Sequence, residues 1–194
     1  MKTLRTFIAV DFPNEVIEKI ASITTYFKTQ LPPRSIKWVD PSKLHLTLKF
    51  MGETPIGKLD AIKSSINNVS RSYSAFRVEV VDLGMYPNTK QPRVIWLGIS
   101  GEENLILLKK QLDRSLEAVG FKPESRAFSP HLTIGRVRRS TNKETVEVIG
   151  QSLSQFKVKT LGVVHIEKIV YYQSELTPQG PHYTILQSSP LNQV

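Results

Sequence analysis

Cysteine is absent from this chain of 194 residues, which excludes disulfide bonds, thiolate nucleophiles and the usual ligands of structural zinc. No hydrophobic run approaches the length of a transmembrane helix, and the Met1–Phe12 segment lacks the apolar stretch of a signal peptide. A Gly-rich loop of the nucleotide-triphosphate type is also missing, which argues against a kinase or an ATP-dependent ligase. We therefore expect a cytoplasmic protein with no membrane partner.

Acidic residues are outnumbered, since 26 Lys and Arg face 17 Asp and Glu and leave a net charge of +9. A positive charge of this size favours an anionic partner, and nucleic acid is the obvious candidate. The basic residues form no long block, which disfavours a basic membrane anchor. With 40% hydrophobic residues and no low-complexity tract, the chain can form one compact domain or two small lobes.

Hydrophobic periodicity predicts strands that alternate with amphipathic helices. The first half is predicted to contain strands over 3–11, 44–50 and 76–83, a helix from Asn14 to Pro32, and a helix from Pro55 capped by Thr54. The second half is predicted to contain strands over 93–99, 132–137 and 156–163, a helix over 103–119, and a helix capped by Thr141. Two last strands are expected over 166–172 and 183–187.

Both halves run strand, helix, strand, helix, strand, and this self-similarity indicates an internal duplication. The first repeat covers about residues 3–84 and the second about 93–163, with the strands within 166–187 completing the sheets. We therefore expect a single α+β domain over residues 1–194 made of two pseudo-symmetric lobes. Their mainly antiparallel sheets should face a central cleft, with the helices on the outside.

Histidine is scarce, with four residues, but two of them begin matched strings: His-Leu-Thr-Leu at 45–48 and His-Leu-Thr-Ile at 131–134. In an extended strand residues i and i+2 point to the same side, so each string places an imidazole beside a hydroxyl. The apolar residues point to the other side and can anchor the strand. Because the strings occupy equivalent positions in the two repeats, they should face each other with two titratable imidazoles and two hydroxyl donors. These are the fewest groups with which a protein can carry out acid–base chemistry on a phosphate ester.

The remaining histidines lack this pattern. His182 begins a third His-x-Thr string but has no counterpart in the repeats, so we interpret it as a coincidence. His165 has no surrounding motif, and a structural role is expected. A metal site is disfavoured because the chain has no His-x-His, no His-Glu-x-x-His and no carboxylate at ligand spacing from the matched strings.

Two basic residues that follow the strings are candidate substrate contacts. Strict alternation places Lys49 on the side of His45 but Arg136 on the side opposite His131. Arg136 is therefore as compatible with a structural ion pair as with phosphate binding. Strand aromatics could stack on a base, but such residues more often belong to a core, and no stacking role is assigned.

The two strings and their flanks resemble the two-histidine (2H) phosphoesterase superfamily, and within it the RNA 2′,3′-cyclic phosphodiesterases, also called 2′-5′ RNA ligase-like proteins. The resemblance runs nearly end to end, with Ile134 and Gly135 as mild departures from the commoner Leu and Ala. It is carried by the segments 5–9, 45–52, 129–136 and 173–176, followed by Gly180 and Tyr183.

The resemblance implies hydrolysis of an RNA-terminal 2′,3′-cyclic phosphate to a 2′-phosphomonoester by a monomer that uses no metal and no cofactor. His45 is expected to be the general acid toward the 3′ oxygen and His131 the general base toward water, although the two strings are nearly interchangeable. Thr47 and Thr133 would bind the phosphate oxygens. Three alternatives stay open: an ATP-independent 2′-5′ RNA ligase, a phosphodiesterase for another small cyclic or 2′-5′-linked nucleotide, and a non-catalytic RNA- or phosphate-binding module.

Overall fold

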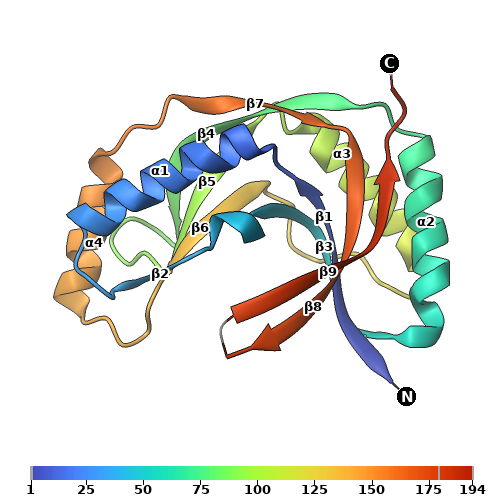
Figure 1. Cartoon of the computed structure of the whole chain (residues 1–194), viewed down its shortest axis with the longest axis horizontal. Coiled ribbons are helices and arrows are strands. Elements are labelled where there is room, and N and C mark those ends of the chain that lie inside the picture. The colour runs from blue at the N-terminus through green and yellow to red at the C-terminus, as the bar shows by residue number, and fades with distance from the viewer. Residues whose placement is uncertain (1, 179, 194) are drawn as a thin grey trace.

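Two antiparallel sheets organise residues 2–178 and 180–193, which are the residues described by a computed structural model of the chain (Figure 1). Within these residues the helices are α1 (Asn14–Gln30), α2 (Leu59–Arg71), α3 (Glu103–Glu117) and α4 (Lys143–Gln155), with short 3₁₀ turns at Pro41–Lys43 and Ile56–Lys58. The strands are β1 (Thr3–Asp11), β2 (Ile36–Trp38), β3 (His45–Pro55), β4 (Phe76–Tyr86), β5 (Val94–Ser100), β6 (His131–Val137), β7 (Thr160–Ile166), β8 (Lys168–Thr177) and β9 (Gly180–Pro190).

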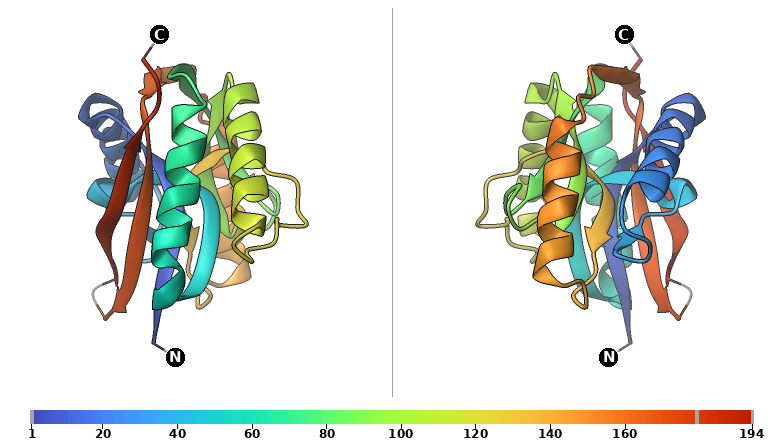
Figure 2. Two further views of the ribbon diagram at one scale, coloured as in Figure 1. Left: turned by 90° about the vertical axis from the view of Figure 1, so that its right-hand side faces the viewer. Right: turned by 90° about the vertical axis from the view of Figure 1, so that its left-hand side faces the viewer.

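The sheets have the strand orders β3-β1-β8-β9 and β2-β6-β5-β4-β7. They contact each other through β3 and β6, the two strands that carry the histidine strings (Figure 1). Helices cover the outer sides, with α2 packed beside α3 (Figure 2). This arrangement confirms the predicted α+β class with two pseudo-symmetric lobes and antiparallel sheets. None of the helices described is both long and apolar enough to cross a membrane.

The sequence repeats and the sheets do not share their boundaries. We expected the strand of residues 76–83 in the first lobe, but β4 pairs with β5 and β7 in the second sheet. The first sheet is completed by β8 and β9 instead. The expected lobe boundary is therefore wrong for β4, because a strand pairs most readily with the antiparallel neighbour that follows it in the chain. Each histidine strand still lies beside the first strand of its own repeat.

Two predicted helix caps are also wrong. Thr54 is part of β3, where its buried hydroxyl shares a hydrogen bond of 2.7 Å with that of Thr6, and α2 begins only after a 3₁₀ turn. Helix α4 is capped by Asn142 instead of Thr141, since the Asn142 side chain accepts a hydrogen bond from the Thr145 amide at 2.9 Å. Both errors move an element boundary and leave the order of elements unchanged.

The apolar residues of the histidine strings anchor both strands in the core. Leu46 and Leu48 of β3 are 1% exposed, and Leu132 and Ile134 of β6 are fully buried. Burial of each such side chain contributes roughly 1.5–3 kcal/mol. These residues fix the strands from behind, so that the opposite face can present polar side chains in defined positions.

Candidate active site

A backbone carbonyl orients each of the matched imidazoles. Nδ1 of His45 donates to the carbonyl of Lys43 at 2.9 Å, and Nδ1 of His131 donates to the carbonyl of Ser129 at 2.7 Å. A carbonyl can only accept, so Nδ1 carries the hydrogen and Nε2 of the neutral ring is left as the acceptor. The partner lies two residues before the histidine in both cases. The duplicated strings therefore direct the same nitrogen, Nε2, away from the backbone.

Aromatic rings surround the two imidazoles in matching ways. The Phe7 ring stacks on His45 at 4.7 Å, and the Tyr183 ring meets it edge-on at 5.2 Å. Around His131, the Tyr86 ring lies edge-on at 5.3 Å and the Trp96 ring at 6.1 Å. The edge-on tyrosines make interplanar angles of 83° and 81° with their histidines. These contacts restrict the rotation of both imidazole rings.

Burial changes the pKa of the His45 imidazole. Desolvation lowers its pKa, and the Lys43 carbonyl and the Asp11 carboxylate oppose this effect only in part. His45 is consequently neutral near pH 7 in the free protein, whereas a general acid must carry a proton. A bound phosphodiester anion would favour the imidazolium form. The expected acid role of His45 is therefore favoured when a phosphate anion is bound beside it.

Strand β3 contains a bulge that reverses the simple alternation beyond Thr47. Consecutive residues of β1 pair with Thr47 and Lys49, so Leu48 is an extra residue. Both Leu48 and Lys49 are buried as a result, and Phe50 lies on the face of His45 with 66% of its surface exposed. Sequence reasoning missed Phe50 as a residue of this face because it assumed an unbroken strand.

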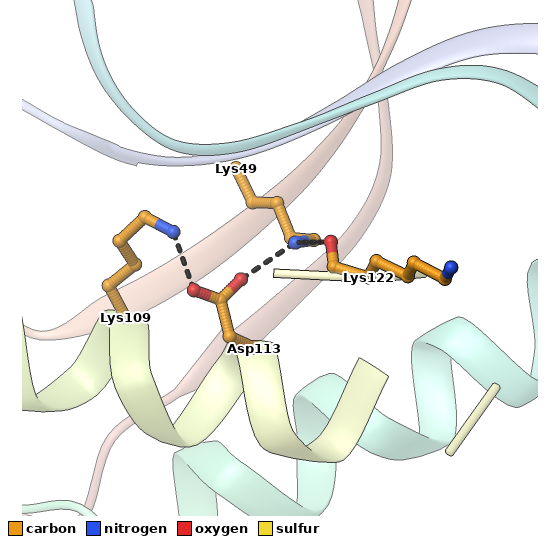
Figure 3. Close-up of polar contacts among 4 residues, drawn as sticks. All are labelled: Lys49, Lys109, Asp113 and Lys122. Carbon is orange, nitrogen blue, oxygen red and sulfur yellow. Dashed lines mark hydrogen bonds and ion pairs between the residues drawn. The ribbon is translucent and has the colours of Figure 1, made fainter. Parts of the chain in front are cut away.

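Lys49 consequently points into the protein, and the expected contact with substrate is wrong. Its Nζ donates to Asp113 Oδ1 at 2.7 Å and to the carbonyl of Lys122 at 2.9 Å (Figure 3). Lys109 donates to the other oxygen of the same carboxylate at 2.6 Å. Lys49 is 2% exposed, so its ammonium group serves as a structural cation.

Strand β6 carries an equivalent bulge, which places Arg136 on the face of His131. Consecutive residues of β5 pair with Thr133 and Gly135, so Ile134 is the extra residue. Ile134 and Gly135 are both buried, and Arg136 is exposed. The side predicted for Arg136 by alternation is therefore wrong. The sequence contained one indication that this position faces the interior. Gly135 occupies the position equivalent to Lys49, and a glycine fits where neighbouring side chains leave no room for a Cβ atom.

Thr47 and Thr133 are half-buried, and each lies two residues beyond its histidine with no bulge between them. They therefore share the faces of His45 and His131, where their hydroxyls can donate to an anion.

The other histidines lie in different settings. His182 on β9 is 68% exposed, with Nδ1 3.8 Å from a carboxylate oxygen of Glu175. His165 is exposed on β7 and pairs with Arg77.

A family model for LigT-like phosphoesterases matches residues 10–96 and again residues 97–183. The chain belongs to this family. The double match agrees with the duplicated strings, and membership makes the protein an enzyme, a phosphoesterase of the 2H type, as the resemblance implied.

Relatives of known name align with nearly the whole length of this LigT-like protein. An RNA 2′,3′-cyclic phosphodiesterase of Methanothermobacter thermautotrophicus is 35% identical over 93% of this chain and 95% of its own. A protein of the same name from Methanocaldococcus jannaschii is 35% identical over 94% of this chain and 98% of its own. The crystal structure of TT0787 of Thermus thermophilus matches with a TM-score of 0.79 and 28% identity, covering 96% of this chain and 97% of that one.

Proposed function

We propose that this phosphoesterase hydrolyses the 2′,3′-cyclic phosphate at the end of an RNA to a 2′-phosphomonoester, with His45 and His131 as its acid–base pair. The observation that carries the proposal is the matched pair of imidazoles. Both have Nδ1 held by a carbonyl, both leave Nε2 available, and both stand on the strands through which the two sheets contact. The names of the relatives support RNA as the substrate class.

The reaction needs two proton transfers and no redox step. Water attacks phosphorus in line with the 3′ oxygen, the bond from phosphorus to that oxygen breaks, and the 2′ ester remains. Nε2 of His131 takes a proton from the water, and Nε2–H of His45 gives one to the departing oxygen. The base ends protonated and the acid neutral, so one proton passes back through solvent before the next turnover. No step calls for a metal ion or a cofactor.

Three further residues stabilise negative charge on the phosphates of the RNA end in this proposal. Thr47 and Thr133 donate to the non-bridging oxygens as phosphorus becomes five-coordinate, which is the state where preoriented donors contribute most. Arg136 supplies a positive charge on the same face as His131, as its position beyond the bulge allows. Its guanidinium can donate two parallel hydrogen bonds to a phosphate.

The test is product identification on a short RNA that ends in a 2′,3′-cyclic phosphate, incubated with the protein and excess EDTA and followed by phosphorus NMR. We expect a 2′-phosphate at the rate seen without EDTA. A 3′-phosphate product would reverse the assignment of the leaving oxygen. Salt-dependent binding with no turnover would identify a phosphate-binding module. Joining to an added RNA with a 5′-hydroxyl in preference to hydrolysis would identify a ligase.

A further inference from the structure

Two positive side chains stand directly opposite each other on neighbouring strands of the second sheet. Lys37 of β2 pairs with Arg136 of β6 in antiparallel register. Residues opposite each other in such a pair share one face, with their Cβ atoms about 5 Å apart. Both side chains are exposed.

The packing of β2 identifies the face on which Lys37 lies. The residues that flank it, Ile36 and Trp38, crowd Gly135, where a Cβ atom would lie 3.1 Å from Ile36 and 2.9 Å from Trp38. The Trp38 ring also stacks on Phe27 of α1, with centroids 6.1 Å apart. That side of the sheet is therefore covered by a helix, and Lys37 points to the other side.

The uncovered side is the one that carries the catalytic groups. Arg136 shares it with Thr133 and His131, because the bulge lies between Arg136 and Thr133. Lys37 consequently extends a row of side chains that begins at His131 and crosses from β6 to β2. Because Ile134 is an extra residue, Thr133 and Arg136 are two ladder positions apart, which is about 7 Å along β6, and β2 lies about 4.8 Å further across.

Like charges placed directly opposite each other on two strands destabilise a sheet. Among residues 2–178 and 180–193, every ion pair within 4.0 Å involves cations other than Lys37 and Arg136. In this described part of the chain, no carboxylate oxygen therefore lies within 4.0 Å of either cation to offset their repulsion. An anion bound between them would do so.

We propose that Lys37, together with Arg136, binds the phosphate that precedes the reacting one in an RNA chain. The proposal rests on the proposed function, because it takes Thr133 as the site of the reacting phosphate. The preceding phosphate is one ribose away, and the flexible lysine and the forked guanidinium can close around it. The substrate class is then a polynucleotide end, because a mononucleotide has no phosphate to occupy this position.

The experiment compares two substrates that share the reacting group: a mononucleotide 2′,3′-cyclic phosphate and an oligoribonucleotide that ends in one. For Lys37→Ala we expect the ratio of kcat/KM, oligonucleotide to mononucleotide, to fall about fivefold, and further for Lys37→Glu. Loss of one phosphate contact should also reduce the slope of log(kcat/KM) against log[salt] for the oligonucleotide by about 0.7. Lys37→Arg should keep the ratio close to that of the unchanged protein.

Lys159→Ala is the matched control, because Lys159 is exposed beside β7 at the opposite edge of the same sheet. It should change neither the ratio nor the salt slope. The melting temperature of Lys37→Ala should equal or exceed that of the unchanged protein, since the variant removes a repulsion.

The outcomes separate this proposal from the proposed function. An unchanged ratio in Lys37→Glu would overturn the phosphate contact while leaving the hydrolysis intact. So would an equal fall of kcat/KM on both substrates accompanied by a lower melting temperature, which would assign the loss to the fold. If the unchanged protein hydrolyses neither substrate, the proposed function itself fails.

Discussion

His131→Ala is expected to lower kcat on a 2′,3′-cyclic phosphate by at least ~100-fold, and His45→Ala by a similar factor, because each removes one proton transfer from the reaction. The fold should survive the change at His131, since the buried Leu132 and Ile134 anchor β6 from the other face. Steady-state rates and a thermal melt of each variant measure the two effects separately. The double variant should lose little more than either single variant, because the two groups act as a unit.

His182→Ala is the matched control for these variants. It removes an exposed histidine from a His-x-Thr string that lacks an equivalent in the repeats. Its rate should stay within about twofold of the unchanged protein, as for a surface substitution away from the reacting groups. Substantial activity in His131→Ala would exclude the two-histidine mechanism. A large loss in His182→Ala would mean that the wrong pair has been chosen.

Asp113→Ala is expected to lower the free energy of unfolding by about 3–5 kcal/mol. The carboxylate is the shared partner of Lys49 and Lys109, which are 2% and 4% exposed (Figure 3). Its removal leaves two ammonium groups buried without a counter-charge. The unfolding free energy from a urea titration measures the loss.

An exposed pair of the same type provides the control. Lys143 and Glu147 are separated by four residues on α4, with a distance of 3.9 Å between their charged atoms. Glu147→Ala should cost no more than about 0.5 kcal/mol, because solvent screens this pair. A cost at Asp113 as small as that at Glu147 would show that the buried lysines do not depend on the carboxylate.

The buried cluster of Asp113, Lys49 and Lys109 also helps to position His131. Lys49 holds the carbonyl of Lys122, and the Nζ of Lys109 lies 5.6 Å from the centroid of the Phe128 ring. Both contacts are with the segment that leads from α3 to Ser129, whose carbonyl orients His131. Asp113→Ala should therefore reduce activity more than its loss of folded protein accounts for, whereas the exposed pair on α4 has no such connection.

Local sequence patterns were sufficient to predict much of the fold and the central part of the site. Alternation identified Leu46 and Leu132 as anchors, and it placed each histidine beside its threonine. The duplication singled out His45 and His131 from four histidines. These features depend on spacing within a short segment, which a sequence displays directly.

The errors arose where distant parts of the chain decide the structure. The side of Lys49 depends on a bulge and on Asp113, which lies 64 residues away in sequence. The sheet that receives β4 depends on its pairing with β5 and with β7, which lies far along the chain. Strand β3 continues to Pro55 because it is an edge strand, where proline is tolerated.

The central claim is that His45 and His131 form one acid–base pair, and the pH dependence of kcat/KM in excess EDTA tests it most directly. We expect a bell-shaped profile, with one limb below about pH 6.5 set by the lowered pKa of His45 in the free enzyme. If His45 is the acid, that limb is the alkaline one, and it should move to higher pH in kcat because the bound phosphate anion favours the imidazolium. His45→Asn should abolish this limb and leave the other. A profile that keeps both limbs in His45→Asn, or that is flat in the unchanged protein, would contradict the account.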